Sequence, residues 1–275
     1  MELPPDLLDA EVMAFDVDGT LAGADHLVSD RTLRALAALD AAGVEPVVIT
    51  GRIAADAAQI LHDAGVEGFA IASGGAVTVD TRTGERLRVA TMDPAEVRGL
   101  VDLALARGVE PILFTAEEMV LVEGSPAYPY LAAVTAGAEP VQVPAADLPT
   151  TGITKAMLFG QAADVDALGP VVAARFPRMT RSMDWSWEMS AAGADKWAAL
   201  AAVLDRLGVP PVRAAGVGDG DNDLVWLAEV GTPVAVANAR PAVKALARLE
   251  IGDHGADAVA ELIEALVAAR SRRAG

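Results

Sequence analysis

The sequence predicts an α/β fold, a doubly wound parallel sheet with an α+β insertion, and three observations support this. Short, continuously apolar runs alternate with helical patterns towards both ends of the chain. Parallel strands that are covered on both faces have this apolar character. In the middle of the chain, apolar and polar residues alternate around turns, which is typical of antiparallel strands. Acidic and other polar residues directly follow several apolar runs, where ligands bind in open α/β sheets.

The amino-terminal segment predicts three strands joined by two helices. Its expected elements are a strand at 12–15, a helix at about 30–42, a strand at 47–49, a helix ending near 64 and a strand at 69–71. Ser29 is a suitable N-cap for the first helix, and Gly43 is a suitable stop. Strand–helix–strand order with short connections indicates parallel βαβ units.

The pattern changes near residue 77 and returns after Asp195. The middle section predicts a hairpin at 77–89, a helix from Pro94 to Arg107, and strands at 111–114, 119–122 and 156–159. After Asp195 the expected elements are a helix to 207, a strand at 212–217, a helix from about 221, a strand at 234–237 and a helix at 256–269. We therefore expect one core formed by residues 1–83 and 186–275, with residues 84–185 inserted into it.

Composition excludes several classes of function. The 275 residues include 21 Lys and Arg against 39 Asp and Glu, a formal net charge of −18. Such a chain is repelled by nucleic acid and by anionic membrane surfaces, so neither is an expected partner. The absence of Cys excludes disulfides, thiolate metal sites and thiol catalysis. The first 16 residues are acidic without a basic residue, and no apolar run reaches about 18 residues, so we expect a cytoplasmic protein.

Two carboxylates follow the first predicted strand. Asp16 and Asp18 are two residues apart, and Gly19 allows a tight loop that directs both towards one point. Two close negative charges raise one pKa, and a divalent cation would relieve the repulsion. One carboxyl could then act as a general acid. An ordinary Asp-Gly turn that caps a helix explains the same residues equally simply.

A second acidic segment, Gly218-Asp219-Gly220-Asp221-Asn222-Asp223, follows the strand ending near 217. Its oxygen ligands suit Mg²⁺. A calcium loop of the EF-hand type is excluded, because Leu224 and Val230 stand where Gly and Glu are required. A dinucleotide-binding loop is disfavoured, because the acids would face a pyrophosphate. A surface acidic turn remains an alternative.

Two further positions lie at strand–helix junctions. Thr50-Gly51-Arg52 follows the second strand, where a hydroxyl and a glycine amide can bind a phosphoryl oxygen. Lys196, one of three lysines, begins the helix after Asp195. Each also has a simpler explanation, since Thr caps helices and helical Lys residues usually face solvent.

Taken together, the order Asp16-x-Asp18-Gly-Thr, then Thr50, then Lys196, then the 218–223 segment resembles the haloacid dehalogenase-like (HAD) phosphohydrolase superfamily. The long insertion resembles the α+β cap of its Cof-type sugar-phosphatase branch. The resemblance implies a Rossmann-like core and a cap that closes over the site. Two positions depart from the branch: Gly74 replaces a usual Asn, and Trp197 replaces the usual Gly after the lysine.

The resemblance also implies roles for individual residues. Asp16 would be the nucleophile that forms an aspartyl-phosphate, and Asp18 would be the general acid and base. The implied Mg²⁺ ligands are the side chain of Asp16, the backbone carbonyl of Asp18, and the carboxylates of Asp219 and Asp223. Thr50 and Lys196 complete the implied catalytic set and would hold phosphoryl oxygens. The implied phosphate- and substrate-binding residues are Gly51, Arg52, Lys196 and Asn222.

These roles predict a Mg²⁺-dependent phosphomonoesterase acting on a small phosphorylated metabolite, such as a sugar phosphate or a phosphoglycerate conjugate. The alternatives are a phosphotransferase such as a hexose-phosphate mutase, and a non-enzymatic sugar-phosphate sensor. In the cap, Lys155, Arg181, Trp185 and Trp187 are candidates for substrate selection. The two tryptophans would share one face of a strand, either as packing or as a sugar-stacking platform. The oligomeric state does not follow from the sequence.

Overall fold

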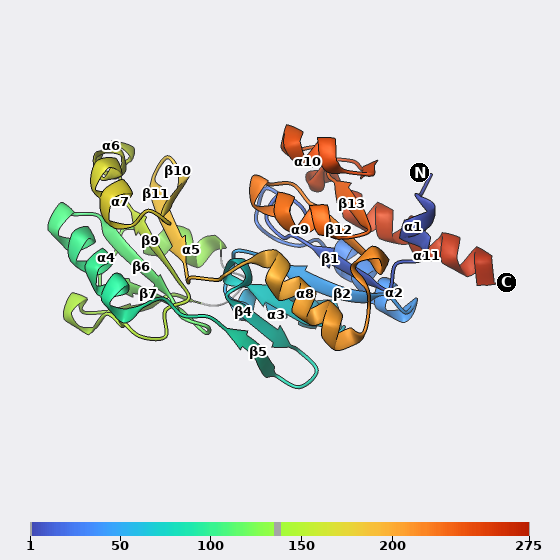
Figure 1. Cartoon of the computed structure of the whole chain (residues 1–275), viewed down its shortest axis with the longest axis horizontal. Helices are drawn as coiled ribbons and strands as arrows, with labels where there is room; N and C mark the ends of the chain where they lie inside the picture. Colours follow the sequence, from blue (N-terminus) through green and yellow to red (C-terminus); the bar gives the residue numbers. More distant parts are fainter. Residues whose placement is uncertain (1, 135–138, 275) are drawn as a thin grey trace.

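The computed structural model describes residues 2–134 and 139–274, which form two lobes side by side, each around its own sheet (Figure 1). The first sheet has the strand order β14-β13-β12-β1-β2-β3-β4-β5. Its strands are β1 (Val12–Phe15), β2 (Glu45–Ile49), β3 (Phe69–Ala72), β4 (Val77–Asp80), β5 (Glu85–Val89), β12 (Ala214–Gly218), β13 (Thr232–Ala235) and β14 (Leu249–Glu250). The pairs from β14 to β3 are parallel, and β4 and β5 are added antiparallel.

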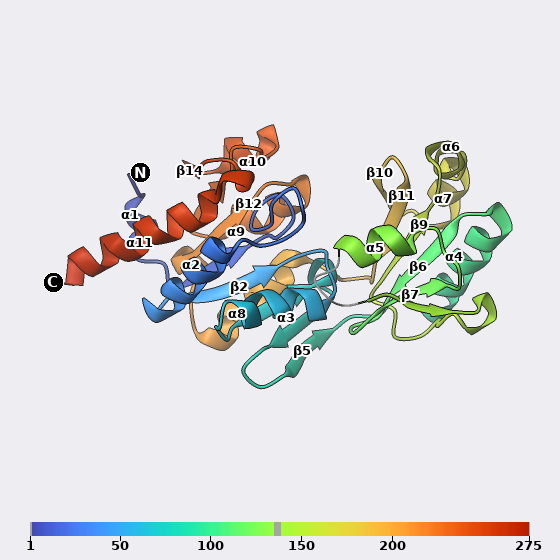
Figure 2. The same ribbon diagram turned by 180° about the vertical axis from the view of Figure 1, so that it is seen from behind.

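Helices cover both faces of the first sheet, as a doubly wound fold requires. Helices α8 (Lys196–Leu207) and α9 (Leu224–Glu229) lie on the face seen in Figure 1. Helices α2 (Asp30–Ala41), α3 (Ala54–Asp63) and α11 (Ala258–Ala274) lie on the face seen in Figure 2. Short helices α1 (Pro5–Leu8) and α10 (Pro241–Leu246) complete this lobe. The predicted fold class is confirmed, and so is the N-cap of α2, where the Ser29 side chain accepts from the Thr32 amide.

The second lobe is an α+β unit with the strand order β10-β11-β9-β6-β7-β8. Its strands are β6 (Glu110–Phe114), β7 (Met119–Val122), β8 (Val141–Val143), β9 (Lys155–Phe159), β10 (Thr180–Met183) and β11 (Ser186–Ser190). Its helices are α4 (Pro94–Arg107), α5 (Tyr128–Val134), α6 (Ala162–Ala167) and α7 (Gly169–Arg175). In both views α5 lies between this sheet and the first lobe, and α4, α6 and α7 lie on the far side (Figures 1 and 2).

The chain changes lobes later than the sequence indicates at both crossings. Strand β5 falls inside the expected insertion 84–185 but pairs with β4 in the first sheet. Strand β11 falls inside the expected core segment but pairs with β9 in the second sheet. Strand partners decide to which lobe a strand belongs, and partners cannot be read from local pattern. We therefore propose cap boundaries near residues 90 and 191.

Two other expectations need correction. The strand expected at 212–217 begins only at Ala214, because Pro211–Arg213 forms a 3-10 turn. Trp185 and Trp187 do not share a strand face, because Trp185 lies in the turn before β11. Trp185 packs edge-on against Tyr130 and Phe159. Trp187 instead packs against the large apolar cluster that contains residues of both lobes.

The two lobes also share apolar contacts. A small cluster covers the face of the second sheet that carries α5, and it includes Phe114, Leu121 and Met157. Ile53 joins this cluster from the first lobe and is 1% exposed. Because Ile53 directly follows Arg52, the cap packs against the loop where phosphate binding is expected.

Among the helices within residues 2–134 and 139–274, none has the length and apolar character of a membrane-spanning segment.

Candidate active site

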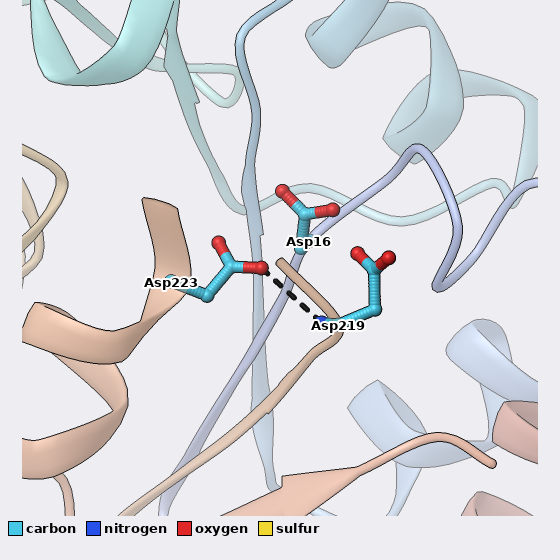
Figure 3. Close-up of side chains that lie close together, drawn as sticks. All are labelled: Asp16, Asp219 and Asp223. Carbon is cyan, nitrogen blue, oxygen red and sulfur yellow. Dashed lines mark hydrogen bonds between the residues drawn. The ribbon is translucent and has the colours of Figure 1, made fainter. Parts of the chain in front are cut away.

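Three carboxylates meet where β1 and β12 end. Asp16 follows β1, and Asp219 and Asp223 follow β12. The two strands are parallel neighbours, so their carboxyl ends lie at the same edge of the sheet. Figure 3 shows the three side chains converging, and one oxygen from each lies within 4.8 Å of the others. Chain segments about 200 residues apart thus form one anionic cluster.

Lys196 bridges this cluster from the other side. Its Nζ donates to Oδ1 of Asp16 at 2.7 Å and to Oδ1 of Asp223 at 2.6 Å. The lysine is the first residue of α8, and the Asp195 side chain caps that helix by accepting from the Ala198 amide. Burial alone would lower the pKa of Lys196, but its two carboxylate partners raise it, so the ammonium stays charged.

Two acids of the cluster, Asp16 and Asp219, have raised pKa values. Burial raises the pKa of Asp16 well above its ordinary value, the Lys196 ammonium opposes this, and Asp223 and Asp219 add to it. Burial and the neighbouring Asp223 raise the pKa of Asp219 to about 6. One lysine therefore does not neutralise the cluster, and a further cation would be favoured there.

Asp223 is held by groups from its own loop and helix. Its Oδ2 accepts from the amides of Asp219 at 3.2 Å and Gly220 at 3.0 Å, the former drawn in Figure 3. The indole Nε1 of Trp226 donates to Oδ1 at 3.0 Å. Asp223 is fully buried, and these donors fix its carboxylate before any ligand arrives.

Asp18 is not part of this group of three carboxylates and has other partners. Arg52 donates to it through Nε at 3.0 Å and Nη2 at 2.6 Å, and Nδ1 of His26 lies 3.3 Å from it. Burial would raise the pKa of Asp18, but the bonds from Arg52 and His26 lower it below its ordinary value. The expected acid–base residue and the expected substrate-binding arginine are thus paired with each other.

The loop after β2 is tied to the loop after β3. The Thr50 hydroxyl is buried and accepts from the Arg52 amide at 3.1 Å. The carbonyls of Thr50 and Arg52 accept from the amides of Gly74 and Ser73. Gly74 has φ 66° and ψ 26°, a left-handed conformation that Asn also adopts readily. The replacement of the usual Asn by Gly74 therefore keeps the backbone of this loop.

The comparisons with known proteins now identify the family. A family model described as haloacid dehalogenase-like hydrolase matches residues 13–263. The chain belongs to this family. An HMP-PP phosphatase from Enterobacter sp. is 28% identical over 241 residues, covering 84% of this chain and 86% of that protein.

Two solved structures share the fold of this haloacid dehalogenase-like hydrolase, cap included. A haloacid dehalogenase-like hydrolase from Bacteroides thetaiotaomicron has a TM-score of 0.85 at 21% identity, covering 94% of this chain and 99% of that one. A HAD subclass IIB sugar phosphatase has a TM-score of 0.75 at 19% identity, covering 93% and 98%. The predicted Cof-type resemblance is confirmed, and the chain is a phosphatase of the HAD superfamily.

The remaining predicted site residues of this hydrolase are dispersed. Gly51 and Asn222 are exposed at the site's edge. Lys155 pairs with Glu188 at 2.8 Å and lies over the Phe114 ring. Arg181 pairs with Asp166 and lies over the ring of Trp187.

Sequence reasoning missed several residues that support the site. Trp226 could have been found, because it stands three residues after Asp223, one turn along the helix. Asn238 donates to the Gly19 carbonyl at 2.8 Å and accepts from the His254 amide, so it ties the first loop to the last. Asp56, which is buried beside Arg52, had no pattern that marked it.

Proposed function

We propose that this chain is a Mg²⁺-dependent phosphomonoesterase that hydrolyses a small phosphorylated metabolite through an aspartyl-phosphate. The observation that carries the proposal is the buried Asp16 carboxylate, bonded to Lys196 and grouped with two further acids at the end of β1. Lys196 orients Asp16 and supplies positive charge next to the position a phosphoryl group would take. The family and its phosphatase relatives support the same reaction class.

The proposed first step is attack of an Asp16 carboxylate oxygen on phosphorus. The new O–P bond forms as the bond to the leaving alcohol breaks, and Asp18 gives its proton to the leaving oxygen. In the second step water attacks the aspartyl-phosphate, and Asp18 takes the proton from that water. The O–P bond to Asp16 breaks, and inorganic phosphate leaves with the Asp16 carboxylate restored. Thr50, Gly51, Arg52 and Asn222 are the proposed groups that hold the phosphoryl oxygens and the substrate.

The residues present fit Mg²⁺. The cluster offers hard oxygen ligands, and burial, together with the neighbouring Asp223 and Asp219, raises the pKa of Asp16, an effect that a bound cation would oppose. Asp16, Asp219 and Asp223 would hold the ion through their side chains, and Asp18 through its backbone carbonyl. A bound Mg²⁺ supplies charge neutralisation for a transferring phosphoryl group.

The cap and the relatives support a proposal for the substrate class. The cap packs against the loop after β2 through Ile53, and a solved structure with this fold is a sugar phosphatase. We propose a sugar phosphate or a phosphoglycerate conjugate as substrate, handled in the cytoplasm. Trp185 packs in an aromatic cluster with Tyr130 and Phe159, and Trp187 donates to the Val165 carbonyl, so packing accounts for both.

The decisive experiment is phosphate release from a panel of phosphorylated sugars, phosphoglycerate conjugates, nucleotides and pyridoxal phosphate. Turnover should require Mg²⁺, stop in EDTA and disappear in Asp16→Asn while the fold persists. Asp221→Asn is the matched control, because Asp221 is an exposed acid in the same segment. Turnover retained by Asp16→Asn would refute the mechanism. Transfer of phosphate to a second sugar would indicate a mutase, and binding without turnover would indicate a sensor.

A further inference from the structure

Asp56 is a buried acid for which the proposed reaction has no use. It is the third residue of α3 and is 2% exposed. Its Oδ1 makes no hydrogen bond to any residue in the described ranges 2–134 and 139–274. A buried carboxylate oxygen without a donor is costly to the folded state. A structural role alone would be met better by Asn, which has the same shape without the charge.

The charges that bear on Asp56 are those of Arg52 and Asp18. Burial raises the pKa of Asp56 to about 6, Arg52 opposes the rise, and Asp18 adds to it. Above neutral pH the carboxylate is therefore ionised. Arg52 precedes the N-cap residue Ile53, and Cα–Cβ bonds in a helix tilt towards its N-terminus, so the third residue of α3 faces the end of the helix next to which Arg52 lies in the chain. The Arg52 guanidinium thus interacts electrostatically with the carboxylates of Asp18 and Asp56 and is hydrogen-bonded only to Asp18.

The pairing of Asp18 with Arg52 in this structure conflicts with the proposed role of Asp18 as the general acid. Arg52 donates to both oxygens of Asp18, and its Nη2 also donates to the His26 carbonyl at 2.9 Å. A carboxyl that gives a proton to a leaving oxygen needs at least one oxygen free to carry that proton. Arg52 must therefore release at least one oxygen of Asp18 during turnover, and the freed part of a guanidinium that is 9% exposed needs a partner besides the phosphoryl group that Arg52 is proposed to hold.

We propose that Asp56 is a positioning residue that accepts the Arg52 guanidinium when Asp18 is released for proton transfer. The exchange keeps one ion pair throughout, so Asp18 can be freed without leaving Arg52 unpaired. The inference rests on the proposed function, because it needs Asp18 as the general acid. A simple helix-dipole role does not explain Asp56, since such acids lie in solvent or accept from amide groups at the helix start.

The test compares two leaving groups in Asp56→Asn and Asp56→Ala. 4-Nitrophenyl phosphate leaves without a proton, whereas glycerol phosphate needs one. We expect kcat/KM for glycerol phosphate, which reports the steps up to release of the alcohol, to fall about tenfold or more, part of the contribution of a general acid. The kcat/KM for 4-nitrophenyl phosphate should stay within about twofold of the parent value, because its leaving group needs no proton. The constant kcat would not make this distinction, because it includes hydrolysis of the aspartyl-phosphate, in which Asp18 acts as a base with either substrate. The control is Asp63→Asn, which removes an exposed charge from the same helix and should change neither rate.

Two outcomes would overturn the proposal: unchanged rates in both Asp56 variants, or equal losses on both substrates, which would indicate a structural role. A double variant adds a second check. If Asp56 acts through Asp18, adding Asp56→Asn to Asp18→Asn should cause no further loss on glycerol phosphate. Additive losses would contradict the coupling. The Asp16→Asn result is independent, since retained turnover there refutes the phosphatase mechanism, whereas a failure confined to Asp56 leaves it intact.

Discussion

Gly75→Ala should disable the enzyme through Lys196, although Gly75 is not a catalytic residue. Gly75 lies in the loop after β3, under the start of α8, with φ 96°. A Cβ added there would lie 2.3 Å from the Asp195 carbonyl oxygen and 2.8 Å from the Lys196 nitrogen. Both are backbone atoms, so no side chain can turn away. Ordinary contact begins at 3.4 Å, so loop and helix must separate by about 1 Å (3.4 − 2.3).

The expected magnitudes follow from this displacement. A non-glycine residue in the left-handed region costs about 1–2 kcal/mol, and overpacking adds about 1–3 kcal/mol. The free energy of unfolding should therefore fall by about 2–5 kcal/mol. Lys196 bonds two carboxylates at 2.7 and 2.6 Å, and it moves with the first turn of α8. A displacement of about 1 Å at such a group costs about 100-fold in rate, so kcat should fall by that factor.

Urea denaturation and kcat for phosphate release check this prediction against a matched glycine. Gly84 also has a positive φ, 71°, but a Cβ there meets nothing within 4 Å. Gly84→Ala should therefore lose only the conformational part, about 1–2 kcal/mol, and keep its kcat. The reasoning is refuted if Gly75→Ala matches Gly84→Ala in both stability and rate.

Three further predictions concern charge at the site. Lys196→Met should lower kcat by about 100-fold to 1000-fold. In EDTA it should also lower the free energy of unfolding by about 3–5 kcal/mol, because two buried carboxylates lose their cation. Equal stability of parent and variant in EDTA would contradict this. Asp56 has a folded-state pKa of about 6 against an ordinary 3.8, so the folded state holds the proton more tightly and stability should fall as pH rises between these values. The loss is about 3 kcal/mol (2.2 × 1.36), and Asp56→Asn should abolish it in denaturation series from pH 4 to 8. Below pH 6, protons on Asp219 should compete with Mg²⁺, so calorimetry should show the apparent Kd rising about tenfold per pH unit, and a Kd constant from pH 7 to 5 would refute this.

Local sequence patterns predicted the elements whose signals are contained within a few neighbouring residues. Asp93 and Pro94 begin α4 and Gly108 ends it as expected, with the Asp93 side chain accepting from two amides. The hairpin of β4 and β5 also lies where alternation placed it. Strands β8 and β10 were missed, because β8 has only three residues and the four residues of β10 are mostly polar, so neither carries much periodicity. The lobe to which β5 belongs depends on its pairing with β4 in the folded sheet, which local pattern does not encode.

In the active site too, some features could be predicted from local sequence, whereas others depend on residues distant in the chain. The order of acidic segments after strands predicted that five acids would converge at one sheet edge, since parallel strand ends must meet there: Asp16, Asp18, Asp219, Asp221 and Asp223. The structure groups Asp16, Asp219 and Asp223, whereas Asp18 pairs with Arg52 and Asp221 is exposed. The partners of these residues depend on side-chain directions between segments distant in sequence. Lys196 lies 180 residues from Asp16, and no spacing rule indicates that its Nζ bridges two carboxylates. The pairing of Arg52 with Asp18 likewise follows from two loops meeting in space.

The charge balance of the two groups of residues supports both the proposed Mg²⁺ site and the proposed exchange of Arg52 between Asp18 and Asp56. Asp16, Asp219 and Asp223 carry three negative charges when ionised against one positive charge on Lys196, a net −2 that a divalent cation cancels. The neighbouring group is different, since Arg52 is one cation between two acids. A phosphomonoester brings further negative charge, which the net −2 of the first group would repel. Chelation should therefore abolish phosphate binding even if every side chain stays in place, whereas loss of Asp56 should spare binding and slow only the steps in which Asp18 transfers a proton.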